Sequence, residues 1–200
     1  MPFISVDLQK DFSAAGGACY QARPCVDFIR KIFIPHCRKH RIQLAEIVSD
    51  YRQPRPGLPF AHCIPGTAGY ESELPGNVKH PQVWIKCMHS PVWVREHGGS
   101  AAEAPGEPYS DPKGFTSWLA SIIGPPDNSK PIVLIGLTLD CCVLCTAQEL
   151  FFRGYRVEFL TEAVDTYCGS QEEKHSLFRV PLANWGKAVS WQEIKERTIG

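Results

Sequence analysis

Residues 134–147 combine a buried apolar run with cysteines at the start of a predicted helix. The run ends at Gly136, where we expect a sharp turn, and the helix follows the pair Cys141 and Cys142. A thiol at a helix N-terminus meets free backbone N–H groups and the positive end of the helix dipole, and both lower its pKa. The same N–H groups can hold an oxyanion. This segment therefore predicts a nucleophilic thiolate.

Two charged residues end other apolar runs. Asp7 follows the run at residues 3–6, and Lys86 follows the run at residues 83–85. In an open parallel sheet, ligands bind in the crevice outside the carboxyl ends of the strands. A buried lysine is costly unless it is paired. An Asp–Lys pair beside the thiol would satisfy both charges and tune the thiol pKa.

Strand patterns alternate with helix patterns along the chain. We expect strands over residues 3–6, 43–49, 83–85, 132–135, 156–160 and 188–189. We expect helices over residues 24–41, 115–123, 142–153 and 171–180, the first kinked or divided at Pro35. Residues 53–80 and 94–113 are predicted to be irregular. The alternation predicts an α/β fold of three layers, with a doubly wound, mostly parallel, Rossmann-like sheet of six strands in a single domain over residues 1–200.

Composition excludes several classes of function. Of 200 residues, 44% are hydrophobic, and Lys+Arg equal Asp+Glu at 21 each, so neither nucleic acid nor an anionic membrane surface is an expected partner. We see no signal-peptide pattern and no apolar run near the ~20 residues of a membrane span. The nine cysteines are therefore expected to be reduced thiols of a cytoplasmic protein. Zero net charge favours a homo-oligomer.

Three motifs carry a family resemblance. Residues 6–12 read VDLQKDF, Lys86 ends the third predicted strand, and residues 136–143 read GLTLDCCV, followed by GYRV at residues 154–157. Together these motifs resemble those of the isochorismatase-like superfamily of cysteine hydrolases, which includes nicotinamidases and N-carbamoylsarcosine amidohydrolases. The matches span nearly the whole chain.

The resemblance implies a role for each matched residue. Asp7 matches the family's catalytic acid/base, Lys86 its supporting cation and Cys142 its nucleophile. A cis peptide is implied at Leu137-Thr138, with the backbone N–H groups of Thr138 and Cys142 as the oxyanion hole. The implied reaction is hydrolysis of a C–N bond in a small amide, carbamoyl or ureido compound through a Cys142 thioester.

One motif departs from the nicotinamidase pattern. Nicotinamidases bind a divalent metal through Asp-x-His after the second strand and through a later His in a His-Cys-x-x-Gly-Thr segment. This chain has Asp50-Tyr51-Arg52 and keeps His62. A cation at Arg52 would repel a metal and pair with Asp50 instead. We therefore predict no metal and no cofactor, with Asp50 and His62 as the positions that match metal ligands.

Substrate-binding candidates lie near the predicted strand ends. They are Phe12, Arg52 and Trp93, with Arg52 as a candidate partner for an anionic substrate group. Residues 94–113 are expected to form a lid or a subunit contact. Two other functions stay open: an isochorismatase-type vinyl-ether hydrolase, which does not need the cysteine, and a non-catalytic scaffold.

Overall fold

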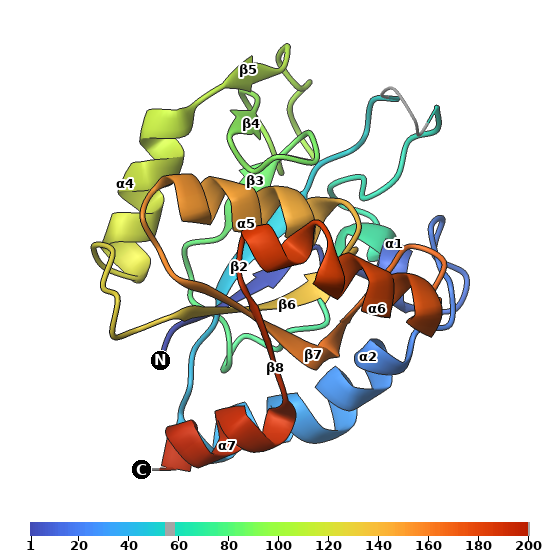
Figure 1. The fold of residues 1–200 in the computed structure, drawn as a ribbon. Helices are drawn as coiled ribbons and strands as arrows, with labels where there is room; N and C mark the ends of the chain where they lie inside the picture. Colours follow the sequence, from blue (N-terminus) through green and yellow to red (C-terminus); the bar gives the residue numbers. More distant parts are fainter. Residues whose placement is uncertain (55–58, 200) are drawn as a thin grey trace.

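The fold is built around one parallel sheet (Figure 1). A computed structural model describes residues 1–54 and 59–199. The strands of this sheet are β1 (Phe3–Val6), β2 (Ala45–Ser49), β3 (Trp84–Lys86), β6 (Ile132–Leu137), β7 (Val157–Asp165) and β8 (Lys187–Val189). They are ordered β3-β2-β1-β6-β7-β8, and every neighbouring pair is parallel. The prediction of a six-stranded, doubly wound parallel sheet is confirmed.

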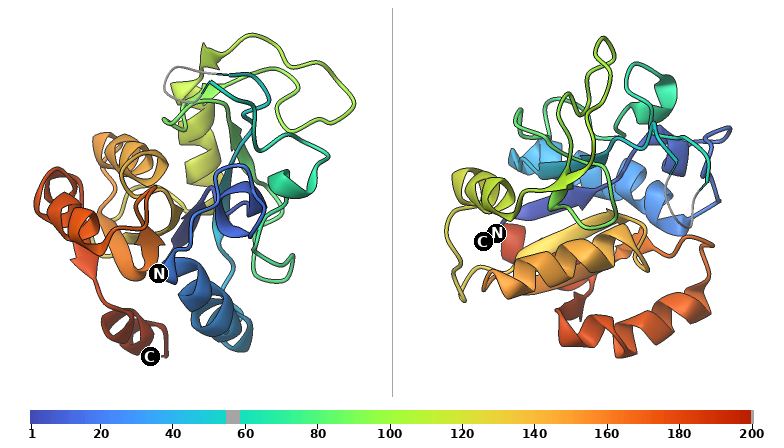
Figure 2. Two further views of the ribbon diagram at one scale, coloured as in Figure 1. Left: turned by 90° about the vertical axis from the view of Figure 1, so that its right-hand side faces the viewer. Right: turned by 90° about the horizontal axis from the view of Figure 1, so that it is seen from above.

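Helices cover both faces of the sheet, so the fold has three layers (Figures 1 and 2). The longer helices are α2 (Pro24–Phe28), α3 (Ile34–His40), α4 (Pro112–Ile122), α5 (Cys142–Phe152), α6 (Gln171–Arg179) and α7 (Trp191–Ile199). Side chains of α2, α3 and α7 pack with those of alternate strand positions in one core, and side chains of α4 and α5 pack in the other. Because both faces are buried, the strands read as apolar runs rather than alternating patterns.

The first long helical region is interrupted in its middle. A π-helical segment, η1 (Ile29–Phe33), separates α2 from α3, and Pro35 lies in the first turn of α3. Proline lacks the backbone N–H that a continuous helix would need there. The chain stays helical from residue 24 to residue 40, so the kink or division predicted at Pro35 takes the form of a π-helical segment just before it.

Several predicted boundaries need correction. The prediction of no strand in residues 94–113 was wrong, because β4 (Trp93–Val94) pairs antiparallel with β5 (Tyr109–Ser110). Two-residue strands are too short to show a sequence period. The strand expected to end at Gly136 continues to Leu137 as β6, and β7 extends beyond residue 160 to Asp165.

The remaining elements are short or at the C-terminal end. They are α1 (Lys10–Ser13), η2 (Ala68–Tyr70) and η3 (Leu182–Asn184), and with α7 they lay outside the sequence prediction. Part of the segment predicted to be irregular, residues 55–58, lies outside the described residues. Among the described residues, no helix has the length and apolar character needed to cross a membrane.

Candidate active site

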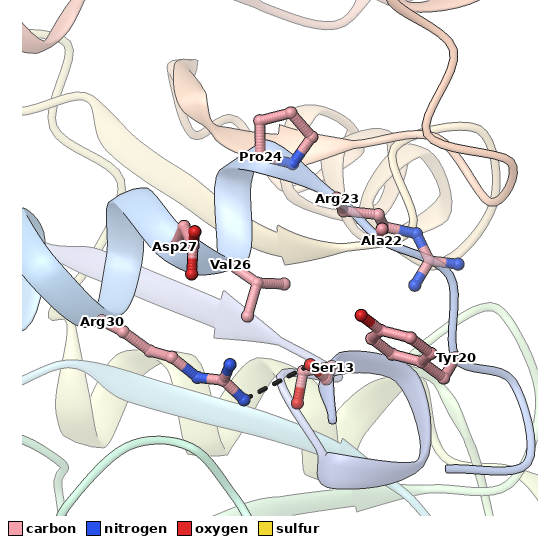
Figure 3. Close-up of a pocket in the computed structure, with 8 residues that line it drawn as sticks. All are labelled: Ser13, Tyr20, Ala22, Arg23, Pro24, Val26, Asp27 and Arg30. Carbon is pink, nitrogen blue, oxygen red and sulfur yellow. Dashed lines mark hydrogen bonds between the residues drawn. The ribbon is translucent and has the colours of Figure 1, made fainter. Parts of the chain in front are cut away.

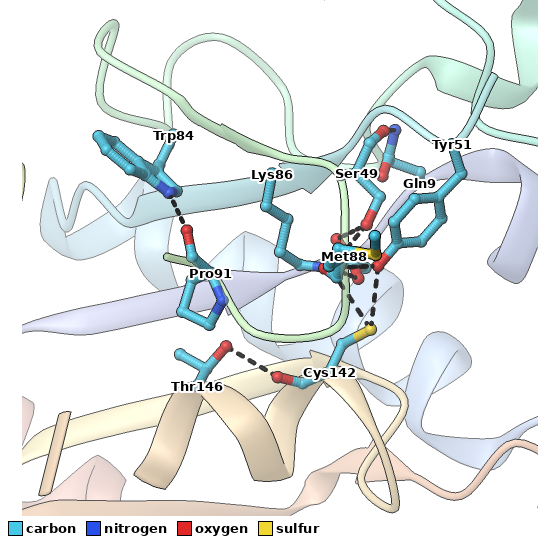
Figure 4. A network of polar contacts seen from close by, with 10 residues as sticks. Gln9, Ser49, Tyr51, Trp84, Lys86, Met88, Pro91, Cys142 and Thr146 are labelled. Carbon is cyan, nitrogen blue, oxygen red and sulfur yellow. Dashed lines mark hydrogen bonds and ion pairs between the residues drawn. The ribbon is translucent and has the colours of Figure 1, made fainter. Parts of the chain in front are cut away.

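Three chemically active side chains, those of Asp7, Lys86 and Cys142, meet at the carboxyl edge of the sheet. Figure 4 shows how Lys86 and Cys142 lie toward one another. Asp7 directly follows β1, Lys86 ends β3, and Cys142 is the first residue of α5, which follows β6. The strand order places β1 beside β6, where the two halves of the doubly wound sheet meet. Ligands bind at this switch point in open α/β sheets.

Lys86 reaches this point from two strands away. Neighbouring strands lie about 4.8 Å apart, so β3 is roughly 10 Å from β1. The long lysine side chain bridges that gap, and its Nζ donates hydrogen bonds to Ser49 Oγ (2.7 Å), on the intervening β2, and to Asp7 Oδ2 (2.8 Å). Ser49 is also the register partner of Lys86.

The Lys86 ammonium also faces the thiol. Its Nζ lies 3.4 Å from Cys142 Sγ, 2.7 Å from Tyr51 OH and 3.1 Å from Met88 O. The side chains of Lys86 and Asp7 are both fully buried. Burial alone would lower the pKa of Lys86, but the charge of Asp7, joined by Cys142 and Tyr51, holds it well above its usual range. The lysine is therefore a permanent cation of this site.

The Asp7 carboxylate is fixed by neighbours that sequence reasoning missed. Ser49 Oγ donates to Asp7 Oδ1 (2.8 Å). Gln9 in turn holds the Ser49 backbone, with Nε2 donating to Ser49 O (3.0 Å) and Oε1 accepting from Ser49 N (2.8 Å). Asp7 also adopts φ 47°, a left-handed value that few residues other than glycine adopt. The position of Ser49 at a strand end between Asp7 and Lys86 is the signal that could have identified it.

The turn before Cys142 depends on a glycine. Gly136 has φ +112°, and a Cβ at this position would collide with the carbonyl oxygen of Val6 in the neighbouring strand. The peptide bond between Leu137 and Thr138 is cis, as the family resemblance implied. The backbone N–H groups of Thr138 and Cys142 donate no hydrogen bond within the described part of the chain. Both groups are thus available to an oxygen atom near the thiol.

The Cys142 thiol is buried, and its pKa lies below the usual value. A hydrogen bond from Cys141 lowers this pKa most, and the positive charge of Lys86 lowers it further. Burial and the negative charge of Asp7 act in the opposite direction, and Asp7 also hydrogen-bonds the thiol. The pKa of Cys141 is raised, first by its hydrogen bond to Cys142 and then by burial. Of these two neighbouring thiols, Cys142 is therefore the one whose ionised form is favoured.

The two positions that match metal ligands have other partners. Arg52 forms a two-pronged ion pair with Asp50, with Nε 2.9 Å from Oδ1 and Nη2 2.5 Å from Oδ2, and Gly99 N also donates to Asp50 Oδ2 (3.0 Å). The hydrogen bonds from Arg52 keep the pKa of Asp50 below its usual value, although burial opposes this. His62 Nδ1 lies 3.2 Å from Phe60 O.

Arg52 is also tied to the segment around β4 and β5. Its Nη1 donates to Glu103 O (3.1 Å) and its Nη2 to His97 O (3.3 Å). With Asp50, these carbonyl groups engage all three guanidinium nitrogens. Arg52 thus clamps the end of β2 to residues 97–103, and its role as a partner of a substrate anion stays a prediction.

The other two substrate-binding candidates differ in exposure. Phe12 is 4% exposed and packs edge-to-face on the His62 ring, with centroids 5.6 Å apart. Trp93 is 39% exposed in β4, and its carbonyl accepts a hydrogen bond from Cys87 N (2.9 Å). Phe12 therefore belongs to the packing beside the site, whereas the Trp93 side chain is open to solvent. Substrate contact stays a prediction for both.

A separate cavity of about 490 Å³ lies beside the start of α2 (Figure 3). None of Asp7, Lys86 and Cys142 lines it. Its two arginines are already engaged. Arg23 donates to backbone carbonyls, and Arg30 pairs with Glu73. We assign this cavity no role in the site.

The geometry can be compared with known proteins. The sequence matches no model of a protein family, and no curated protein matches it. Solved structures do match. An isochorismatase-like hydrolase from Alkaliphilus metalliredigens has a TM-score of 0.67 at 17% identity, covering 98% of this chain and 97% of its own.

Two further matches extend over similar lengths. The pyrazinamidase of Pyrococcus horikoshii in complex with zinc has a TM-score of 0.63 at 20% identity, covering 95% of this chain and 98% of its own. The N-carbamoylsarcosine amidase from Thermoplasma acidophilum has a TM-score of 0.58 at 20% identity, covering 95% of this chain and 96% of its own.

The chain has the isochorismatase-like hydrolase fold. This confirms the fold that the motifs at residues 6–12 and 136–143 implied. Within this fold, the three residues that the sequence resemblance singled out, Asp7, Lys86 and Cys142, form one buried network.

Proposed function

We propose that this protein is a cysteine hydrolase that cleaves a C–N bond of a small amide, carbamoyl or ureido compound. One observation carries the proposal. The Nζ atom of Lys86 lies 2.8 Å from Asp7 Oδ2 and 3.4 Å from Cys142 Sγ, with all three side chains buried. A base, a cation and a thiol are thereby placed at the switch point of the sheet.

The steps follow from the positions of these groups. Asp7 takes the thiol proton, and the Cys142 thiolate forms a bond to the carbonyl carbon of the substrate. The oxyanion lies against the N–H groups of Thr138 and Cys142. Asp7 returns the proton to the leaving nitrogen as the C–N bond breaks. Water, deprotonated by Asp7, then hydrolyses the thioester and restores the thiol.

Lys86 stabilises the ionised states of this cycle. Its positive charge beside Sγ favours the thiolate, and its hydrogen bond orients Asp7 toward the thiol. Burying such charges costs free energy of folding. A non-catalytic scaffold protein would be as stable, or more so, with well-packed apolar residues in place of the charged ones. The buried network therefore supports the enzyme over the scaffold.

The site does not fit a divalent metal. The zinc complex of the Pyrococcus horikoshii pyrazinamidase is a property of that protein. Here the Arg52 guanidinium holds the Asp50 carboxylate, and no group of three metal-ligating side chains lies together in the described parts of the chain. We therefore propose a mechanism without metal.

The metal-free proposal has a direct test. Arg52→His would release the Asp50 carboxylate from its ion pair and supply an imidazole near His62. Carboxylates and imidazoles are both common zinc ligands. We expect calorimetric titration with Zn²⁺ to show one more bound ion in Arg52→His than in the wild type, because the free cysteines of both proteins can also bind zinc. Zinc binding by the wild type that Asp50→Asn abolishes would contradict the proposal.

The central test compares turnover by two proteins. A panel of small amides, carbamoyl compounds and ureides is incubated with wild type and with Cys142→Ala, and products are detected by mass spectrometry. We expect wild-type turnover of at least one compound and loss of that turnover in the variant. Product formation that survives Cys142→Ala would contradict the thioester mechanism, whereas hydrolysis of a vinyl ether by both proteins, with no turnover of the panel, would favour vinyl-ether chemistry instead. Cytoplasmic location and a homo-oligomeric state stay predictions from the sequence.

A further inference from the structure

The Tyr51 hydroxyl lies in the centre of the buried network (Figure 4). It is 2.7 Å from Lys86 Nζ, 2.9 Å from Met88 O and 3.6 Å from Cys142 Sγ. An ammonium group has only donors, so the tyrosine oxygen accepts from Lys86. The single hydroxyl proton can then be donated either to the Met88 carbonyl or to the sulfur.

The second hydroxyl of the network has no such choice. Ser49 Oγ accepts from Lys86 and donates its own proton to Asp7 Oδ1 (2.8 Å). Lys86 has three protons for five neighbouring acceptors, so it cannot serve the sulfur and every other acceptor at once. A second hydrogen-bond donor besides Lys86 would stabilise the Cys142 thiolate. The Tyr51 hydroxyl, 3.6 Å from the sulfur, can be that donor.

The ring of Tyr51 is held in place. Its side chain is fully buried, and the Lys86 ammonium lies 4.9 Å from its ring centroid. The His62 ring packs on it with centroids 5.0 Å apart, and His62 N donates to Tyr51 O (3.0 Å). The hydroxyl oxygen therefore stays at its position, and its proton can turn about the C–O bond between the two acceptors.

We propose that Tyr51 is a further catalytic residue, whose hydroxyl proton turns from Met88 O to Cys142 Sγ when the thiolate forms. The proton stays bonded to the Tyr51 oxygen in this step. The hydroxyl only exchanges a hydrogen bond to a neutral carbonyl for a hydrogen bond to an anion. Hydrogen bonds to ionised groups are about twice as strong as neutral ones. The thiolate is then held between two donors, Lys86 and Tyr51. This inference rests on the proposed function, which makes Cys142 the nucleophile.

Other groups also act on the thiol. Asp7 faces it from the end of β1 and Lys86 from β3, while Cys141 and Cys145 face it from the start of α5. Asp7 favours the neutral thiol, and Lys86 and Cys141 favour the thiolate. Removing the Tyr51 hydroxyl leaves all of these groups in place. It also leaves Lys86 with one acceptor fewer, which would lower the pKa of Cys142, so a rise in that pKa would report on the lost hydroxyl donor.

The test measures ionisation of Cys142 without any substrate. The full chain is alkylated with iodoacetamide between pH 5 and 10, and the rate at Cys142 is followed by mass spectrometry, with fragment ions distinguishing it from Cys141 and Cys145 on the same peptide. In Tyr51→Phe we expect the apparent pKa to rise by about one unit and the rate at pH 7 to fall about tenfold. Tyr155→Phe is the matched control, because its buried hydroxyl donates to Gly124 O (2.7 Å) away from the network.

Two replacements of similar shape separate the donor from the packing if Tyr51→Phe does not fold. At position 51, 4-aminophenylalanine keeps an N–H donor, whereas 4-methylphenylalanine fills the same space without one. We expect the amino form to keep the wild-type profile and the methyl form to raise the apparent pKa. Equal profiles for the two would overturn the proposal.

The outcomes for Tyr51 and for the proposed function are distinguishable. An ordinary, unshifted pKa for Cys142 in the wild type would contradict the nucleophile itself. A lowered wild-type pKa that Tyr51→Phe leaves unchanged, or lowers further, would overturn only the role of Tyr51. A rise in Tyr51→Phe that is absent from Tyr155→Phe would support it.

Discussion

Two buried Asp–Lys pairs in this protein each have a cysteine beside them, and the two cysteines differ in ionisation. Lys86 Nζ lies 2.8 Å from Asp7 Oδ2 next to Cys142, and Lys174 Nζ lies 3.0 Å from Asp165 Oδ1 next to Cys25. Both aspartates follow or end a strand of the same sheet. The pKa of Cys142 is lowered, whereas the pKa of Cys25 is raised well above its usual value.

The groups that contact each sulfur atom explain why the pKa values of the two thiols shift in opposite directions. At Cys25, burial raises the thiol pKa most and the carboxylate of Asp165 raises it further, because Lys174 binds the far oxygen of that carboxylate. At Cys142, the hydrogen bond from Cys141 lowers the thiol pKa most, and the Lys86 ammonium, 3.4 Å from the sulfur, lowers it further. The same three residue types thus accompany a raised thiol pKa at Cys25 and a lowered one at Cys142, where a neighbouring thiol donates to the sulfur and the cation lies against it.

The cluster of Asp165, Lys174 and Cys25 holds helices in place. Asp165 Oδ2 accepts a hydrogen bond from Cys25 N (2.8 Å), in the first turn of α2. Its Oδ1 accepts from Gln171 Nε2 (3.1 Å) and from Lys174, both on α6. A carboxylate at a helix N-terminus is stabilising. Asp165 therefore anchors two helices to the end of β7, and Cys25 serves as packing.

The largest expected difference between the clusters is in turnover. Cys142→Ala should reduce hydrolysis of any accepted amide by at least about a thousandfold, because no nucleophile remains. Cys25→Ala should change it by no more than about twofold. Product formation by the two variants, measured side by side by mass spectrometry, checks this. Equal losses in the two variants would mean that the clusters are not functionally distinct.

The next difference is in stability. Lys86→Met should lower the free energy of unfolding by about 3–5 kcal/mol, because it leaves a buried carboxylate without its cation. Lys174→Met should cost only about 1–2 kcal/mol, since Asp165 keeps its bonds from Cys25 N and Gln171. Urea unfolding of both variants measures the two values. Similar losses would show that Asp165 depends on its lysine as strongly as Asp7 does.

The smallest difference is in the pH dependence of stability. The raised pKa of Cys25 means that folding favours its protonated form, so its contribution is complete below about pH 8.5 and is lost as pH rises above that value. The lowered pKa of Cys142 has the opposite sign. Its contribution is complete above about pH 8.5 and is lost as pH falls through the folded-state pKa.

Unfolding of reduced protein from pH 6 to 10 separates these two contributions. Each cysteine contributes a slope of up to about 1.4 kcal/mol per pH unit in its own window. Cys25→Ala should flatten the loss of stability above pH 8.5, and Cys142→Ala should flatten the gain below it. If both variants change the same limb of the curve, the assignment of opposite shifts is wrong.

Much of the fold was predictable because its signals are local. Apolar runs located the six strands of the large sheet, and Pro35 located the division of the first helical region. The hairpin of β4 and β5 escaped prediction, because strands of two residues carry no period. The extension of β7 to Asp165 was missed because residues 161 and 162 are polar and half-buried, which ends the apolar run.

The site was predictable only in part. The motifs identified Asp7, Lys86 and Cys142. Gln9 lies within the motif at residues 6–12 but was assigned no role, and Ser49 lies in none of the motifs. Their role comes from hydrogen bonds between residues 40 positions apart in the chain. Arg52 was a candidate for pairing with Asp50 or with a substrate anion, and the structure shows the pair with Asp50.

The sequence by itself determined the doubly wound sheet and the chemical types at its carboxyl edge, because strand periodicity and strand-end residues are properties of short segments. It could not distinguish Cys142 from Cys25 by charge, since each lies far along the chain from its lysine. Only the tertiary structure decided that an ammonium lies against the sulfur of Cys142, whereas the carboxylate of Asp165 is the strongest charged neighbour of Cys25. Ionisation of a buried thiol depends on contacts of a few ångströms, and the packing of β3 against β2 and β1 sets those contacts here.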